Sequence, residues 1–186
     1  MDFRSDSRIV LTLDAGGTNF AFSAMQSGES ICESIHLPAE AHDLERSVAN
    51  LVDGFQQLFD QSRQRPAAIS FAFPGPADYA RGIIYNVGNL PAYQGGVPLG
   101  PLLEERFQIP VFINNDGDLF AFGEAMAGLL PRINQSLADA GSAKRFRNLI
   151  GVTLGTGFGG GIVIDGQLLV GDNFAAGEVW LLRNKV

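Results

Sequence analysis

Two glycine-rich segments near opposite ends of the chain have the composition of loops that bind phosphate groups. Residues 14–18 read Asp-Ala-Gly-Gly-Thr after an aliphatic run, and residues 155–161 read Gly-Thr-Gly-Phe-Gly-Gly-Gly between two apolar runs. Glycines let backbone N–H groups approach phosphate oxygens closely, and threonine adds a hydroxyl donor. An aspartate at a strand end, such as Asp14, can hold Mg²⁺ through water. The simpler alternatives are a hairpin with a Gly-Gly turn and a glycine-rich turn with a bulge.

Two acidic residues stand where they could contact a substrate. Asp116 lies at a predicted junction of a strand and a helix, where its carboxylate could accept the proton of a hydroxyl that attacks a phosphoryl group. Glu178 could bind sugar hydroxyls through its two carboxylate oxygens. The alternatives are an N-cap for Asp116 and an ordinary surface acid for Glu178. Two phosphate-type loops with a junction carboxylate between them rarely occur together by chance.

The elements that must position these residues follow from the hydrophobic periodicity. Apolar residues at three- and four-residue spacing over residues 44–59 predict the clearest helix, and Asp165-Gly166 predicts a two-residue hairpin turn. A polar connection is expected after residue 130. The predicted strands are 9–13, 19–25, 30–37, 67–73, 111–113, 149–154 and 161–164, and the other predicted helices are 102–107 and 116–130. This order predicts an α/β or mixed α+β lobe with one mixed sheet.

The bulk composition excludes several classes of protein. With 186 residues, 46% of them hydrophobic, the chain has the length and apolar content of one globular domain, residues 1–186. A net charge of -7 opposes binding to nucleic acid or to anionic membrane surfaces, and no apolar run is long enough to cross a bilayer. The N-terminus does not resemble a signal peptide, and the single Cys32 cannot form an internal disulfide bond. We therefore expect a cytoplasmic protein.

The motifs and their order resemble those of the ROK family of sugar kinases and related repressors, within the actin-like, ribonuclease H-like ATPases. The resemblance implies a ribonuclease H-like (actin-like ATPase) lobe with a mixed β-sheet flanked by helices. It further implies that the chain is the N-terminal lobe, and that a C-terminal lobe with most of the adenosine site is absent. The matching segments are LDAGGTN (13–19), PGPAD (74–78), GNLPAY (88–93), NND (114–116), FGEA (122–125), GTGFGGG (155–161) and AGE (176–178).

The same resemblance implies a function and a role for each matched residue. It points to ATP-dependent phosphoryl transfer to a sugar hydroxyl, with ATP and Mg²⁺ as cofactors. Asp116 would be the catalytic base and Asp14 would organise Mg²⁺. We also expect the chain to form a homo-oligomer, as a dimer, through an exposed apolar face. The residues expected to bind phosphate are Gly16, Gly17, Thr18, Gly155, Thr156 and Gly157, and those expected to bind the sugar are Gly75, Asn89, Asn115 and Glu178.

Three departures from the family pattern change these expectations. Val179 and Trp180 stand where the family has Gly-His, Asp118 replaces the second Asn of the family's Asn-Asp-x-Asn segment, and the cysteine-rich zinc motif is missing. We therefore predict no zinc site, and we interpret His36 and His42 as ordinary residues. Two other functions stay open. One is a sugar-sensing transcriptional regulator, disfavoured because few residues precede the first strand, and the other is a catalytically inactive sugar-binding module.

Overall fold

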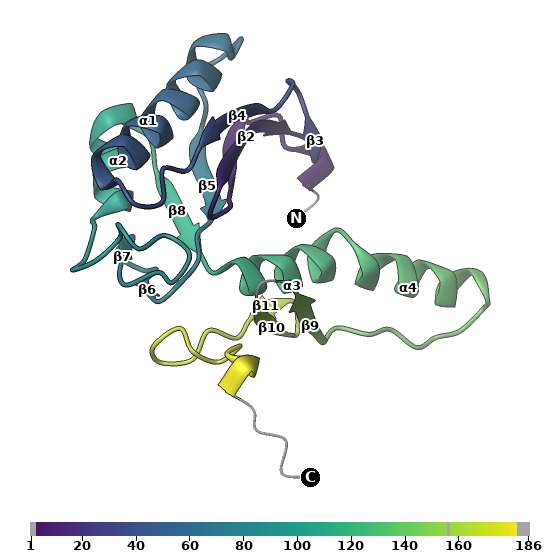
Figure 1. The fold of residues 1–186 in the computed structure, drawn as a ribbon. Coiled ribbons are helices and arrows are strands. Elements are labelled where there is room, and N and C mark those ends of the chain that lie inside the picture. Colours follow the sequence, from purple (N-terminus) through teal and green to yellow (C-terminus); the bar gives the residue numbers. More distant parts are fainter. Residues whose placement is uncertain (1–2, 156, 182–186) are drawn as a thin grey trace. The chain divides into compact units, whose positions relative to one another are not determined.

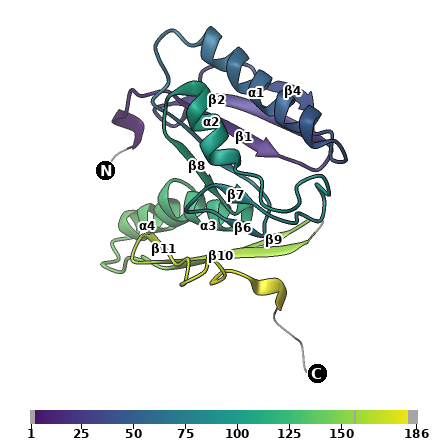
Figure 2. The same ribbon diagram turned by 90° about the vertical axis from the view of Figure 1, so that its left-hand side faces the viewer.

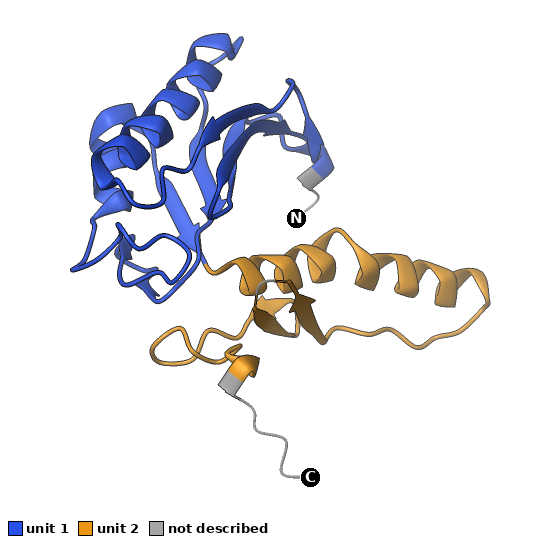
Figure 3. Cartoon of the chain, viewed as in Figure 1, with its two compact units in different colours: residues 1–114 blue, residues 115–186 orange. Residues whose placement is uncertain are grey.

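The computed structural model describes residues 3–155 and 157–181. Contacts between residues divide the chain into two compact units, residues 1–114 and residues 115–186. Figure 1 shows the course of the chain, and Figure 3 shows the two units in different colours. The expectation of a single lobe stays a prediction. Among the described residues, no helix is long and apolar enough to cross a membrane.

The first unit is built on a six-stranded mixed sheet. Its strand order is β3-β2-β1-β5-β8, and β4 also pairs with β2. The β1–β2 pair is antiparallel, whereas β1–β5 and β5–β8 are parallel, so the predicted mixed sheet is confirmed. The strands are β1 (Val10–Ala15), β2 (Asn19–Gln26), β3 (Glu29–Ser30), β4 (Ile35–Pro38), β5 (Ala68–Ala72) and β8 (Val111–Asn114). The unit also contains η1 (Phe3–Ser5), α2 (Leu99–Phe107) and a small hairpin of β6 (Ala77–Asp78) and β7 (Ile83–Ile84).

Helix α1 (Leu44–Gln61) covers this sheet and confirms the helix predicted from periodicity. Asp43 caps it, because its side chain accepts a hydrogen bond from Arg46 N at 3.1 Å. The ring of Phe55 on the buried face meets Phe22 of β2 edge-on, with centroids 5.1 Å apart, and also meets Phe107 of α2. These aromatic contacts therefore join both helices to the sheet. Figure 1 shows the two helices on the same side of the sheet.

The second unit places two helices and a small antiparallel sheet around a separate core. It contains α3 (Asp116–Met126), α4 (Leu129–Asp139), β9 (Leu149–Leu154), β10 (Phe158–Ile164), β11 (Gln167–Leu168) and η2 (Val179–Leu181). The strand order is β11-β10-β9, and α3 packs along β9 and β10, as Figure 2 shows. The Asp165-Gly166 hairpin turn is confirmed, because both residues have positive φ, 50° and 77°. The buried core residues are Ala121, Ala125, Leu130 and Val163.

The opposite face of β9 and β10 is apolar and exposed. Side chains alternate along each strand, so Ile150, Val152 and Leu154 share the face that does not meet α3. Ile150 is 70% exposed and Leu154 is 84% exposed, and Phe158 of β10 lies beside Leu154 on the same face. An exposed apolar face of this kind supports the expected self-association, which stays a prediction.

Several predicted elements have different bounds in the structure. The helix predicted for residues 102–107 begins at Leu99. Residues 30–37, predicted as one strand, form the separate short strands β3 and β4, both paired with β2. The helix predicted for residues 116–130 ends at Met126, and the expected polar connection contains α4. Pro131 is compatible with the first turn of α4, where its missing N–H is not needed. The strand predicted to begin at Gly161 begins at Phe158, so most of the second glycine cluster belongs to β10.

Candidate functional site

The first glycine segment is the turn of the β1–β2 hairpin. Asp14 is exposed near the end of β1, and it lies beside Ala72 of β5 in the register of the sheet. Ala72 in turn lies beside Asn114, so the carboxyl ends of three parallel strands meet along one row. The segment is therefore a hairpin turn, and this turn carries the residues that are expected to bind phosphate. Phosphate binding by this turn stays a prediction. Thr18, in the same turn, is exposed.

Gly17 brings this turn into contact with the predicted sugar-binding residue Asn89. A Cβ added to Gly17 would lie 3.0 Å from the backbone oxygen of Asn89 and 3.2 Å from its Cβ. At Gly16, an added Cβ would lie 2.9 Å from the backbone oxygen of Asn19 in the same turn. A Cβ at Gly16 would require the turn to shift, and one at Gly17 would require Asn89 to yield by a few tenths of an ångström. One residue of each predicted class, phosphate-binding and sugar-binding, is thus adjacent in the first unit.

Gly75, the other predicted sugar-binding residue of this unit, lies in the turn after β5. An added Cβ there would lie 2.9 Å from the hydroxyl oxygen of Tyr79. That hydroxyl donates a hydrogen bond to the backbone oxygen of Phe73 at 3.0 Å, which ties the turn to the strand before it. The Gly75–Pro76 peptide bond is cis.

The N-cap of α3 is Asn115 and not Asp116. The Asn115 Oδ1 accepts hydrogen bonds from Gly117 N at 2.8 Å and from Asp118 N at 3.3 Å. Asp116 is exposed at the first helical position, where its Oδ1 accepts from Gly117 N at 2.9 Å. The capping alternative for Asp116 is therefore wrong. Its carboxylate lies at the positive end of the helix dipole.

The second glycine cluster divides into an open turn and a packed strand. An added Cβ at Gly155 or at Gly157 would meet no atom within 4 Å, and Gly155 N donates to Gly157 O at 3.0 Å across the turn. Thr156 lies outside the described residues. Gly160 and Gly161 belong to β10, where the absence of a side chain allows close packing against neighbouring segments. Only the first part of the cluster thus has the open backbone that an anion needs.

Glycines also let three segments of the second unit lie against one another. A Cβ at Gly161 would lie 2.8 Å from the Cα of Asp118 and 2.9 Å from the Cβ of Ala121, both on α3. One at Gly117 would lie 2.8 Å from both the nitrogen and the oxygen of Gly160. One at Gly177 would lie 2.6 Å from the oxygen of Gly160. The first turn of α3 and the segment before η2 both pack directly on β10.

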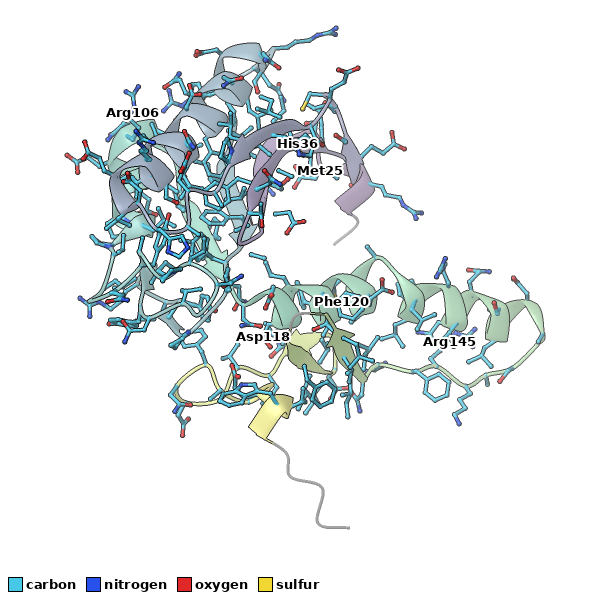
Figure 4. The ribbon with its side chains drawn as sticks, viewed as in Figure 1. Met25, His36, Arg106, Asp118, Phe120 and Arg145 are labelled. Atoms are coloured by element: carbon cyan, nitrogen blue, oxygen red, sulfur yellow. The ribbon has the colours of Figure 1, made fainter. Side chains whose placement is uncertain are left out.

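Asp118, in the first turn of α3, is the buried carboxylate of this region and is labelled in Figure 4. It is only 4% exposed, and its Oδ1 has no hydrogen-bond partner among the residues that the structure describes. Burial, and then the negative charges of Glu178 and Asp116, raise the pKa of Asp118 from 3.8 to about 6. In the sequence, Asp118 is recognisable only as a departure from the family's asparagine. Its burial had no signal in the sequence, since aspartate is normally exposed.

Glu178 is half-buried and follows the closely packed Gly177. The indole Nε1 of Trp180 donates a hydrogen bond to its Oε2. Glu178 therefore has a defined partner in the structure, and its role in sugar binding stays a prediction. Within the described ranges, no three His, Cys, Asp or Glu side chains lie together in a way that could hold a metal ion.

The predicted residues are thus distributed over both units. Asp14, Gly16, Gly17, Thr18, Gly75 and Asn89 lie in the first, and Asn115, Asp116, Gly155, Gly157 and Glu178 lie in the second. Contacts within the first unit bring Gly17 to Asn89, and electrostatic interactions within the second connect Asp116, Asp118 and Glu178. That the two glycine turns converge on one nucleotide stays a prediction.

Comparisons with known proteins agree with the motif pattern. The model of the ROK family matches residues 10–180. A glucokinase from Halalkalibacterium halodurans is 29% identical over 176 residues, 92% of this chain and 49% of that protein. An N-acetyl-D-glucosamine kinase from Vibrio cholerae serotype O1 is 31% identical over 173 residues, 91% of this chain and 51% of that protein. The crystal structure of a Parabacteroides distasonis glucokinase has a TM-score of 0.90 at 60% identity, covering 100% of this chain and 52% of that one. The chain spans about half the length of these relatives.

Proposed function

The chain belongs to the ROK family, and from this premise we propose that it supplies the phosphate- and sugar-facing half of an ATP-dependent sugar kinase. The relatives at 29% and 31% identity carry the names of a glucokinase and an N-acetyl-D-glucosamine kinase, and both are about twice as long. A hexose or an N-acylated amino sugar is therefore the substrate class that we propose.

Asp116 is the catalytic base of the proposed reaction. Its carboxylate takes the proton of the sugar hydroxyl while the sugar oxygen forms a bond to the γ-phosphorus of ATP. The bond from that phosphorus to the bridging oxygen breaks, and ADP leaves with the electron pair. The observation that carries this assignment is that Asn115 caps α3, which leaves the exposed Asp116 carboxylate without that structural role.

The two glycine turns would hold the triphosphate. Gly17 in one turn and Gly157 in the other would offer backbone N–H groups with no Cβ beside them. The N–H groups of Gly16 and Gly155 donate to Asn19 O and Gly157 O and so fix the shape of each turn. Asp14 fits Mg²⁺, because that ion keeps most of its water and commonly uses one or two carboxylates together with substrate phosphates. When bound, the ion would neutralise charge that develops on the transferred phosphoryl group.

Asn89 and Glu178 are the residues that we propose contact the sugar. An amide and a carboxylate together offer both donors and acceptors to hydroxyl groups. Positioning of this kind supplies much of the rate of phosphoryl transfer, since the protein does little covalent chemistry itself. Because the relatives are twice as long, we expect residues 1–186 alone to bind ATP weakly. Calorimetry that showed submicromolar ATP affinity for this chain would contradict this division of the site.

The decisive test is Asp116→Asn in a coupled assay of ADP release against hexoses, N-acylated amino sugars and fructose. We expect turnover to be lost while nucleotide affinity stays nearly unchanged, because the amide cannot accept the proton but keeps the shape of the side chain. A variant that phosphorylates sugars at the wild-type rate would show that Asp116 is not the base. Sugar binding without turnover in the wild-type protein would favour the inactive sugar-binding module.

A further inference from the structure

Asp118 has a buried carboxylate oxygen with no partner, directly beneath the segment that carries Glu178. A Cβ added to Gly177 would lie 3.0 Å from the Asp118 Oδ1, so the backbone immediately before Glu178 crosses over that oxygen. An unpaired charge in this position is costly, because burial removes its hydration and nothing in the structure replaces it. The carboxyl group is accommodated more easily with a proton.

The charged groups around Asp118 make its ionised form still less favourable. Asp116 on the same helix and Glu178 on the crossing segment, residues 175–178, are both acidic, and both raise the pKa of Asp118. The strands packed on this helix, β9 and β10, carry no titratable side chain. Helix α4 contributes Arg132 and Asp139, which follow the far end of α3 and do not contribute to the shift.

The backbone hydrogen bonds described for the crossing segment are local. The backbone nitrogens of Ala176, Glu178 and Val179 donate to Val170, Ala175 and Gly177, all within the same stretch of chain. Its contact with β10 depends on the close approach of Gly177 to Gly160 and of Gly160 to Val179. A repulsive charge beneath Gly177 can therefore displace Glu178 at little cost in broken hydrogen bonds.

We propose that Asp118 is a positioning residue for Glu178: with a proton it allows the segment of residues 175–178 to lie on β10, and without that proton it drives Glu178 away. The proton moves only between solvent and the Asp118 carboxyl group, and no other reactant is needed. In the sugar kinase proposed above, on which this part rests, Glu178 contacts the sugar. Ionisation of Asp118 then weakens sugar binding and leaves the phosphoryl transfer step itself unchanged.

The chain contains its own reporter of this movement. Trp180 is the only tryptophan in the sequence, it is 61% exposed, and its indole donates to the Glu178 carboxylate. Its fluorescence should change when Glu178 moves, and the measurement needs neither substrate nor activity. We expect the emission of the wild-type chain to show one transition between pH 5 and pH 8, with a midpoint near pH 6.

Two variants separate the proposal from a general effect of pH. Asp118→Asn keeps the shape of the side chain but cannot ionise, so its emission should stay constant over this range. Glu178→Gln removes the like charge, so its midpoint should move to lower pH. Circular dichroism at each pH confirms that the chains stay folded. The proposal is overturned if Asp118→Asn keeps the wild-type transition, or if the folded wild-type chain shows none.

A kinetic measurement tests the link to the sugar. If only the protonated form binds well, the sugar KM of the wild-type enzyme rises by up to about tenfold for each pH unit above 6, with kcat little affected. The KM of Asp118→Asn should not follow this rise. An equal pH dependence in both proteins would overturn the role in sugar binding. Absence of turnover would count against the proposed kinase function alone, because the fluorescence experiment stands independently of it.

Discussion

The contact between β10 and α3 gives a sharp prediction about two glycines of the same cluster. In Gly161→Ala, the new Cβ would lie 2.8 Å from the Cα of Asp118 and 2.9 Å from the Cβ of Ala121. Comfortable carbon–carbon contacts are about 3.5–4.0 Å, so each overlap is close to 1 Å. The neighbouring atoms belong to the helix backbone or to a side chain without rotamers, and neither can turn away. The helix itself must move off the strand.

Overpacking of this kind typically costs about 1–3 kcal/mol, and we expect Gly161→Ala to reach the upper end of that range. The matched control is Gly157→Ala, because no atom of the described residues beyond its chain neighbours lies within 4 Å of the new Cβ. Its stability should stay within about 0.5 kcal/mol of the wild type. The two variants make the same chemical change four residues apart and differ only in what surrounds it.

Urea unfolding followed by circular dichroism measures both free energies of unfolding. A loss below about 1 kcal/mol in Gly161→Ala would refute the packing argument, since the structure offers no direction in which the strand alone can yield. An equal loss in Gly157→Ala would refute the division of the cluster into an open turn and a packed strand.

Three further predictions concern stability. Asp118→Asn should match the wild type in stability near pH 4 and exceed it by up to about 3 kcal/mol at pH 8, measured from urea midpoints. Folding raises the pKa of Asp118 from 3.8 to about 6, so the stability of the wild type falls as pH rises between those values. Gly54→Ala should lower the free energy of unfolding by about 3 kcal/mol in the same assay, because its Cβ would lie 2.4 Å from the Phe22 ring. Gly123→Ala should raise it by about 0.5–1 kcal/mol, because this position in α3 is exposed and no described atom lies within 4 Å of the new Cβ. Tyr93→Phe should cost about 1–2 kcal/mol by leaving the buried Ser47 hydroxyl without its 3.0 Å partner, and thermal unfolding that showed no loss would contradict this.

The sequence predicted best those elements whose pattern alone decides their structure. The apolar stripe of α1 and the continuous apolar run of β5 leave little choice of conformation, and both are confirmed. Helix α4 was missed although Leu130, Ile133 and Leu137 follow helical spacing, and only Leu130 of this helix is buried. The start of β10 was missed because glycine has no strand preference, and here it is the close packing of α3 that places glycines in a strand.

The candidate site divides in the same way. Backbone motifs such as the β1–β2 turn could be recognised from residue types, because glycine after a strand has few structural uses. The contact of Gly17 with Asn89 joins residues distant in sequence, and the choice of Asn115 over Asp116 as the cap depends on backbone angles. The burial of Asp118 depends on Gly177 crossing it, which no local pattern reports.

The apolar face of β9 and β10 affects the solubility of this chain in salt solutions. Ile150 and Leu154 present their side chains to water, and this apolar surface adjoins the turn of Gly155 and Gly157 that we propose holds phosphate. Sulfate and phosphate salts strengthen apolar association, so they bring the chain out of solution through this face first. Buffers for nucleotide titrations should therefore avoid salting-out anions, which would otherwise couple aggregation to the signal being measured.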